Sequence, residues 1–516
     1  MDDRLAGALG LLPGYAAQHV VLSMTALALG VAISLPLAIL ASRRPRLRWA
    51  ALAVASLMQT IPGLALLALF YPLLLAVSAL TTRLFGFGVP ALGFLPSLLA
   101  LTIYSMLPIL RNGVTALIGV DPAYVEAADG VGMTPRQRLF RVELPLAAPV
   151  IMAGIRTAAV WTIGIATLST AVGQTSLGNF IFSGLQTENW IYVLTGCIAV
   201  VILALFVDQM LGLVETGAVR RDGRRIAVGA ALLLLGTAAA AAPLLRGSAA
   251  DYVLGAKNFS EQYILAGLMA ERIEDGGHTV TRKEGLGSAV IFRALAGNEI
   301  DAYVDYSGTL WSNVMERRDV PPREVMLAEL TRFMRERYGV TVLGALGFEN
   351  AYALVMPKKR AEALHIRTIA DLAAHAPTMS IAADYEFFSR PEWESLRQAY
   401  GLKFRAQRQM QPDFMYAAAA SGEVDVIAGY TSDGLIAKYD LVALGDPRQA
   451  IPPYDAIVLL APKRATDQAL RSALQPLLGR IDIADMREAN LRAAGGNDAS
   501  SPNAVARWLW DKIAKP

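Results

Sequence analysis

The sequence predicts a chain of two parts, an N-terminal all-α polytopic membrane domain of about six spans and a C-terminal α/β domain with two lobes. The 516 residues are 54% apolar and only 18% charged, and their mean hydropathy is +0.41. Soluble domains carry about 25% charged residues. The deficit is uneven, because the long apolar runs nearly all precede residue 245 and charged residues recur every few positions after it. Two parts suited to different solvents therefore share one chain.

Six apolar runs are long enough to cross a membrane, which takes about 20 mostly apolar residues in a helix. They cover residues 19–42, 49–80, 89–110, 147–172, 190–214 and 226–245. The second run is long and contains Pro62, which is expected to kink it. We expect domain boundaries at 1–220 for the transmembrane domain, 221–250 for the sixth span and a linker, and 251–516 for the α/β domain.

Arginines gather in the loops after the first, third and fifth runs: Arg43, Arg44, Arg46, Arg48, Arg111, Arg136, Arg138, Arg141, Arg220, Arg221, Arg224 and Arg225. The opposite side has Arg4, Arg83 and Arg246. Cytoplasmic loops carry an excess of Lys and Arg. The bias therefore places the amino terminus outside, the loop after the third run in the cytoplasm, and everything after Arg246 outside.

The sixth run allows two interpretations. RRDGRR followed by IAVGAALLLLGTAAAAA has the basic, apolar and small-residue order of a secretory signal. It is either a retained anchor helix or the signal, cleaved or kept, of an exported protein that became joined here. Both deliver the later residues to the same side.

Two charged residues, Arg156 and Asp208, lie inside apolar runs near their expected cytoplasmic ends. Charges within spans are costly and usually mark a functional site. The alternatives are that their side chains reach the interface or that they form a structural pair.

The loop EAADGVGMTPRQRLFRVELP, from Glu126 to Pro145, is charged and broken by glycine. Gly130 and Gly132 end a first short helix, and Pro135 suits the first turn of a second. The spacing resembles the coupling loop of ATP-binding-cassette importer permeases, over roughly residues 15–215. The residues that carry this resemblance are Glu126, Ala127, Ala128, Gly132, Leu144 and Pro145.

This resemblance implies that the loop docks on a cytoplasmic ATPase subunit and that the permease works as a pair, here a homodimer. The sequence holds no G-x-x-x-x-G-K-[ST] motif, the loop that cradles nucleotide phosphates. The ATPase is therefore expected on a separate polypeptide.

The residues from about 251 onward alternate short apolar strands with helical stretches, a rhythm typical of α/β domains. The chain is expected to cross between two lobes near residues 347–352 and near residues 429–434. Such hinged lobes can close on a ligand.

Four tyrosines stand in turn-like or strand-end contexts: Tyr306, Tyr352, Tyr430 and Tyr454. Any one of them could simply pack in the core, but together they suggest a box of rings. Aromatic faces attract cations by about 0.5–2 kcal/mol and select quaternary ammonium groups in cages. Lys257, Thr309 and Arg390 are candidates to hold a carboxylate on the same ligand.

The segments KNFSEQYIL, GNEIDAYVDYSGT, GFENAYALVM, DYEFFSRPEW and the run from AGYTSDGLI to IPPYDA resemble, in order, those of the glycine betaine, choline and carnitine binding proteins. The resemblance implies a periplasmic-binding-protein-like fold. It implies a cage of Tyr306, Tyr352, Tyr430 and Tyr454, and an acid site of Lys257, Thr309 and Arg390. Asn350 matches a polar position beside the cage. YVDYSGT and PEW depart from the YPEYTGT and PDG common in that family, which leaves the choice of substrate open.

The sequence thus predicts the permease and fused receptor of an importer for betaine-type quaternary ammonium compounds, in a bacterial inner membrane with the α/β domain in the periplasm. Ergothioneine, a bulkier betaine, is an alternative cargo. A ligand-gated channel is an alternative class, which has no need of an ATPase docking loop. No catalytic, metal or cofactor motif is found among the four histidines and Cys197, and no basic tract suits nucleic acid. The expected partners are the ATPase, a second copy, the quaternary amine and membrane lipid.

Overall fold

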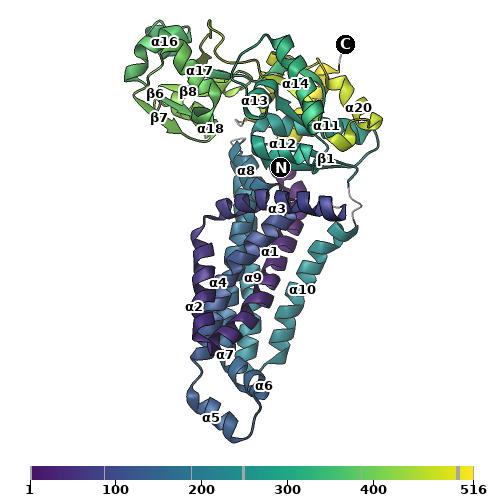
Figure 1. The fold of residues 1–516 in the computed structure, drawn as a ribbon, viewed down its shortest axis with the longest axis vertical. Coiled ribbons are helices and arrows are strands. Elements are labelled where there is room, and N and C mark those ends of the chain that lie inside the picture. The colour runs from purple at the N-terminus through teal and green to yellow at the C-terminus, as the bar shows by residue number, and fades with distance from the viewer. Residues whose placement is uncertain are drawn as a thin grey trace. The chain divides into compact units, whose positions relative to one another are not determined.

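The structure, a computed structural model, describes residues 3–86, 88–186, 189–246, 250–384, 386–494 and 500–514. The chain forms two compact units, one of residues 8–181 and 194–248 and one centred on residues 249–516 (Figure 1). The first is helical and the second is α/β, as predicted. Each unit is described by itself.

The helical unit contains six helices that are long and apolar enough to span a membrane, which confirms the predicted number. Its elements are α1 (Asp3–Arg43), α2 (Pro45–Thr60), α3 (Gly63–Phe85), α4 (Phe94–Ile118), α5 (Pro122–Gly130), α6 (Pro135–Arg138), η1 (Leu139–Glu143), α7 (Leu144–Ile165), η2 (Ala166–Val172), α8 (Gly178–Gln186), α9 (Trp190–Arg220) and α10 (Gly223–Arg246). Helix α10 covers the predicted sixth span at residues 226–245. It does not distinguish a retained anchor helix from a secretory signal.

The predicted single span over residues 49–80 is wrong, because the structure breaks it into α2 and α3. Ile61 adopts an extended conformation with ψ 125°, as a residue before proline prefers. Pro62 has no amide proton to continue the helix. Figure 1 shows α2 running along the helical unit and α3 turning across it. Pro62 thus ends a helix where the sequence suggested a kink.

Arg156 and Asp208 form an ion pair, so of the alternatives given for these two residues the structure shows the structural pair. The Arg156 guanidinium on α7 donates to the Asp208 carboxylate on α9 at 2.7 and 2.8 Å. It also donates to Glu215, two helical turns further along α9, at 2.8 Å. These bonds fix α7, which follows directly on the charged loop, to α9.

The charged loop forms the predicted helix–turn–helix. Helix α5 ends at Gly130, and Gly132 takes a positive φ of 76°, a conformation that glycine adopts at low cost. Thr134 then caps α6 in a capping box with Gln137. A π-helical turn, η1, leads without a break into α7.

The α/β unit has two five-stranded sheets, one in each lobe. The first sheet has the order β2 (Val280–Leu286), β1 (Tyr252–Lys257), β3 (Ala302–Tyr306), β10 (Asp455–Leu460), β4 (Thr341–Glu349). The second has the order β7 (Ala406–Gln409), β6 (Ser380–Ala383), β8 (Val426–Tyr430), β5 (Tyr352–Pro357), β9 (Leu441–Ala443).

Helices cover both sheets. Those of the first lobe are α11 (Ser260–Asp275), α12 (Ser288–Ala296), α13 (Ser307–Asn313), α14 (Arg323–Tyr338), α20 (Gln468–Leu474), α21 (Ile483–Ala493) and α22 (Pro502–Ile513). Those of the second are α15 (Lys358–Ala363), α16 (Ile369–His375), α17 (Pro391–Tyr400), α18 (Pro412–Ala420) and α19 (Leu435–Lys438). The strands β5, β8, β3 and β10 are almost wholly buried.

The first crossing between lobes lies where it was predicted, between β4 and β5 at residues 349–352. The predicted second crossing near residues 429–434 is wrong. The chain stays in the second lobe through α19 and β9 and returns over residues 444–454, because β9 pairs with β5 and β10 pairs with β3. Strand β9 has three residues, too few to show a periodic pattern in the sequence.

Candidate ligand-binding site

A cavity of about 150 Å³ lies where the two lobes meet, and all eight residues predicted for ligand binding line it. These are Lys257, Tyr306, Thr309, Asn350, Tyr352, Arg390, Tyr430 and Tyr454. Phe259, Asp384 and Glu386 also line it and were not predicted. The structure therefore brings the predicted set together, while their contact with a ligand stays a prediction.

The strands position the four tyrosines. Tyr306 is the last residue of β3, Tyr430 the last of β8, and Tyr352 the first of β5. Tyr352 and Tyr430 are direct partners in the antiparallel β5–β8 pair, so their side chains lie on the same face. Tyr454 directly precedes β10, which pairs with β3 beside Tyr306.

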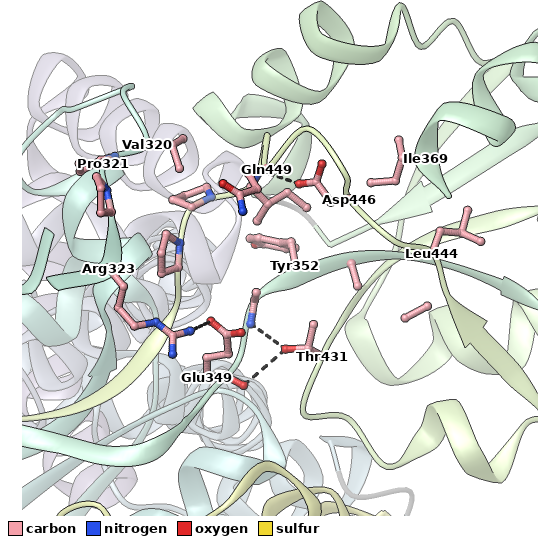
Figure 2. A pocket seen from close by; sticks show the side chains of 17 residues that line it. Val320, Pro321, Arg323, Glu349, Tyr352, Ile369, Thr431, Leu444, Asp446 and Gln449 are labelled. Atoms are coloured by element: carbon pink, nitrogen blue, oxygen red, sulfur yellow. Dashed lines mark hydrogen bonds and ion pairs between the residues drawn. The ribbon is translucent and has the colours of Figure 1, made fainter. Parts of the chain in front are cut away.

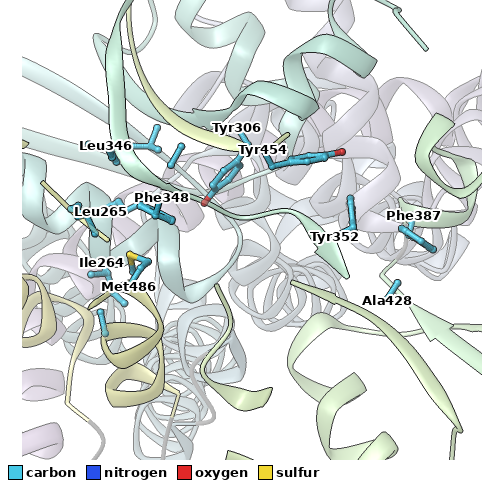
Figure 3. Close-up of a cluster of buried hydrophobic side chains, with 14 of the residues drawn as sticks. Ile264, Leu265, Tyr306, Leu346, Phe348, Tyr352, Phe387, Ala428, Tyr454 and Met486 are labelled. Carbon is cyan, nitrogen blue, oxygen red and sulfur yellow. The ribbon is translucent and has the colours of Figure 1, made fainter. Parts of the chain in front are cut away.

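The rings face one another at contact distances. Tyr352 lies with its ring centroid 5.1 Å from that of Tyr430 and 5.9 Å, edge to face, from that of Tyr454. Phe259, the N-cap of α11, stacks 6.1 Å from Tyr306 and 6.3 Å from Tyr430. Figure 3 shows Tyr306, Tyr352 and Tyr454 within the buried apolar cluster of the α/β unit. Five rings of the described residues thus form this aromatic wall, and they pack in or against the core of the α/β unit.

Each tyrosine hydroxyl donates to a buried carboxyl group. Tyr306 donates to Glu261 at 2.5 Å, Tyr352 and Tyr430 both donate to Asp384 at 3.0 and 2.6 Å, and Tyr454 donates to Glu392. Burial raises the pKa of all four phenols well above the ordinary value of 10. The hydroxyls therefore keep their protons and act as donors.

Glu261 accepts four hydrogen bonds from side chains of both lobes. It is almost fully buried, and it accepts from the hydroxyls of Tyr306 and Ser432 and from the side-chain amides of Asn350 and Asn490. The distances run from 2.5 to 3.1 Å. Because Ser432 follows the second-lobe strand β8, Glu261 ties both lobes to the cavity wall.

The two candidate cations each have a carboxylate partner already. The Lys257 ammonium pairs with Asp305 behind the cavity and lies 5.3 Å from the centre of the Tyr306 ring. Arg390 donates to Glu392 at 3.1 and 3.2 Å and to the Tyr454 hydroxyl at 3.1 Å. Both charges are thus largely neutralised, and they can still donate toward a ligand because an ammonium has three donors and a guanidinium five.

Asn350 and Thr309 supply neutral polar groups. Asn350 is 6% exposed, and its side-chain oxygen has no hydrogen-bond partner among the described residues. Thr309, in the first turn of α13, is also buried. A buried polar atom without a partner costs free energy, so the Asn350 oxygen is a natural acceptor for a donor on the cargo.

A second cavity, of about 650 Å³, is lined in part by residues of both crossing segments (Figure 2). Figure 2 shows Arg323 paired with Glu349 on its wall, and four prolines are among the other lining residues. Tyr352 touches both cavities. The four tyrosines meet at the smaller cavity, which is therefore the candidate site.

Comparison with known proteins accounts for both units. Residues 250–511 match the family described as the substrate binding domain of ABC-type glycine betaine transport systems. Residues 30–220 match the family of inner membrane components of binding-protein-dependent transport systems. The chain belongs to the glycine betaine-type ABC importer family. It is a permease fused to a betaine-type substrate-binding domain, and it is a multi-pass membrane protein.

Similar proteins cover different shares of this chain. The Helicobacter pylori (strain G27) ergothioneine transport permease/ergothioneine binding protein is 28% identical over 90% of this chain and 83% of its own length. The Bacillus subtilis (strain 168) choline transport system permease is 39% identical over 38% of this chain and 84% of its own length. A crystal structure of a glycine betaine/carnitine/choline ABC transporter is 27% identical, with a TM-score of 0.45, over 51% of this chain and 98% of the solved chain.

Sequence reasoning also missed the three carboxyl groups that accept from the tyrosine hydroxyls. Glu261, Asp384 and Glu392 all lie within segments that carry the family resemblance. Two of them, Glu261 and Glu392, occupy the first turn of a helix, where acidic residues are common because they favour the helix dipole. Their place in the chain therefore suggested a local role.

Proposed function

We propose that this chain captures a small quaternary ammonium compound, of the glycine betaine, choline or carnitine type, and passes it through its own membrane domain. The observation that carries this proposal is the cavity walled by four tyrosines. A quaternary ammonium has no N–H to donate, and ring faces attract it without requiring one. The substrate classes transported by the relatives support the same reading.

The ligand's other end would meet Lys257, Thr309 and Arg390. In glycine betaine and carnitine that end is a carboxylate, which an arginine can bind with two parallel hydrogen bonds. Since both cations are already paired, the site suits a ligand whose charges nearly cancel, or one with a hydroxyl in place of the acid. Asn350 would accept from a hydroxyl of choline or carnitine.

Ergothioneine is a second candidate, because the relative that shares the fused architecture over 90% of this chain is named for it. Drug-sized ligands occupy pockets of about 300–1,000 Å³. The cavity of about 150 Å³ suits choline or glycine betaine better than the bulkier ergothioneine.

ATP hydrolysis would be the work of a separate subunit that docks on the helix–turn–helix of residues 126–145. Val131 and Phe140 in this hairpin, and Tyr124 just before it in α5, are exposed apolar side chains, and exposed apolar surface marks protein–protein contacts. The spacing of Glu126, Ala127, Ala128, Gly132, Leu144 and Pro145 supports the same role through its resemblance to coupling loops. Two copies of the chain would form the membrane pathway, with domains at 1–220, 221–250 and 251–516.

A binding screen tests this proposal. The full chain in lipid nanodiscs is titrated by calorimetry with glycine betaine, choline, carnitine and ergothioneine. We expect saturable heat with at least one of the first three, and weaker or no heat with ergothioneine. Preferential binding of ergothioneine would transfer the assignment to the second candidate, and no heat with any of the four would contradict the proposal.

A further inference from the structure

The four cage tyrosines share a feature that ring stacking alone does not require. Each donates its phenolic proton to a buried carboxyl group. A tyrosine that donates to a carboxylate carries more electron density in its ring than one that donates to water or to a neutral oxygen. The attraction of a ring face for a cation comes from that density.

Asp384 is the carboxyl group that accepts from two of the four tyrosines. One of its oxygens accepts from both the Tyr352 and the Tyr430 hydroxyls. The other accepts from the backbone amides of Glu386 and Phe387 at 2.7 and 2.9 Å. Asp384 is 6% exposed and lines the cavity. The side chain is thus held from behind by the main chain and faces two rings of the cage.

Among the described residues Asp384 forms no ion pair, although the Arg390 guanidinium lies 5.3 Å from the centre of the Tyr352 ring. Lys257 pairs with Asp305 and Arg390 pairs with Glu392. Among the residues that the structure describes, no lysine or arginine nitrogen lies within 4.0 Å of the Asp384 carboxylate, the limit for an ion pair. A buried charge without a partner is costly, and a bound cation would relieve that cost.

Resting on the function proposed above, we propose that Asp384 is a positioning residue that selects the ligand by charge, acting through the rings of Tyr352 and Tyr430. It orients both hydroxyls and raises the electron density of both rings. It also gives the cavity a negative electrostatic potential, which a cationic headgroup neutralises. A trimethylammonium group would gain from this field, and an uncharged group of the same shape would not.

The test compares choline with 3,3-dimethyl-1-butanol, in which carbon replaces the nitrogen. Both are titrated into the full chain in nanodiscs, as wild type and as Asp384→Asn. Asn keeps an acceptor for the backbone amides and keeps the size, so the cage retains its shape. We expect the wild type to prefer choline by about tenfold or more, and Asp384→Asn to lose most of that preference with little change for the alcohol.

Asp446→Asn is the matched control. Asp446 also accepts from a tyrosine hydroxyl in the second lobe, that of Tyr400, but it lines the other cavity. We expect this variant to keep the full preference for choline. Tyr430→Phe provides a second route, because it keeps the ring and removes the hydroxyl that reaches Asp384. It should lose part of the preference.

The outcomes separate this inference from the proposed function. If Asp384→Asn weakens choline and the alcohol by the same factor, Asp384 only supports the fold and the inference is overturned. The same holds if Tyr430→Phe and Asp384→Asn both keep the wild-type preference. If the wild type binds no quaternary ammonium compound, the proposed function fails first and the inference fails with it.

Discussion

At the scale of single residues, the cavity depends on tyrosines fixed by strand ends and by carboxyl groups. Tyr352 and Tyr430 are paired across β5 and β8, so both side chains leave the sheet on the same face. Their hydroxyls share Asp384. These contacts hold two of the four rings in place within the second lobe, which lowers the entropy cost of ordering them on binding.

Replacing Tyr430 by Ala removes one ring face and leaves a gap in the wall. We expect Tyr430→Ala to weaken binding of the preferred quaternary ammonium compound by about 1–3 kcal/mol, from the lost cation–π contact and the unfilled space. Calorimetry on the full chain measures this. Tyr430→Phe, which keeps the ring, should lose less. An unchanged dissociation constant for Tyr430→Ala would remove Tyr430 from the site.

Glu261 makes a prediction about pH. Burial raises the pKa of its carboxyl above the ordinary 4.5, although its four hydrogen bonds oppose the shift. The native state then holds this proton more tightly than the unfolded chain does, so the free energy of unfolding falls as pH rises from about 4.5 toward the raised pKa. We expect Glu261→Gln to flatten this fall in melting experiments between pH 4.5 and 7. A slope equal to that of the wild type would contradict it.

Sequence reasoning reached the tyrosines and not the carboxyl groups for a physical reason. Tyrosines beside glycine, proline and Asn are unusual, because a large ring at a turn needs something to pack against. Acidic residues such as Glu261 and Glu392 in a first helical turn are ordinary. Only the folded chain shows that they point back at the rings.

At the scale of elements, the charged hairpin from α5 to η1 is held together by ion pairs. Arg138 pairs with Asp129 of α5 and with Glu143 of η1, and Arg43 at the end of α1 reaches the same Glu143. The hairpin is therefore tied both to α7, which it enters directly, and to α1. A push on α5 would be transmitted to two membrane helices.

A charge on the exposed face of this hairpin should uncouple transport from binding. Val131 is 73% exposed, so Val131→Glu should leave the fold and the ligand affinity unchanged. The new charge should prevent the ATPase from binding to the apolar surface of the hairpin. We expect ATP-driven uptake in cells to fall to background and calorimetric binding to persist. Val219→Glu, at an exposed position of α9 outside the hairpin, is the control. Uptake at the wild-type rate in Val131→Glu would exclude the hairpin as the coupling element.

The element boundaries that were predicted wrongly are those that no short sequence pattern determines. Pro62 can either kink one long helix or end it, and the apolar run reads the same in both cases. The run alone therefore does not predict the break after Ile61. The return between lobes over residues 444–454 depends on the pairing of the three-residue strand β9 with β5, a long-range contact. The helix–turn–helix was predicted correctly because Gly130, Gly132 and Pro135 act locally.

At the scale of the whole molecule, the central claim is that one polypeptide captures its cargo outside the membrane and is driven from inside. The arginine bias sets the orientation of the spans, and the family match supplies the two functions. Joining receptor and permease raises the effective concentration of the loaded receptor at the pathway. This claim requires the α/β unit and the α5–η1 hairpin to face opposite compartments.

Cysteine labelling in spheroplasts tests this most directly, because Cys197 is the only cysteine of the chain. In a Cys197→Ser background, single cysteines replace Glu394 in the α/β unit, which is about half exposed, and Val131 in the hairpin. The account predicts that a membrane-impermeant maleimide labels position 394 in intact spheroplasts and position 131 only after permeabilisation. Labelling of both positions only after permeabilisation would contradict it.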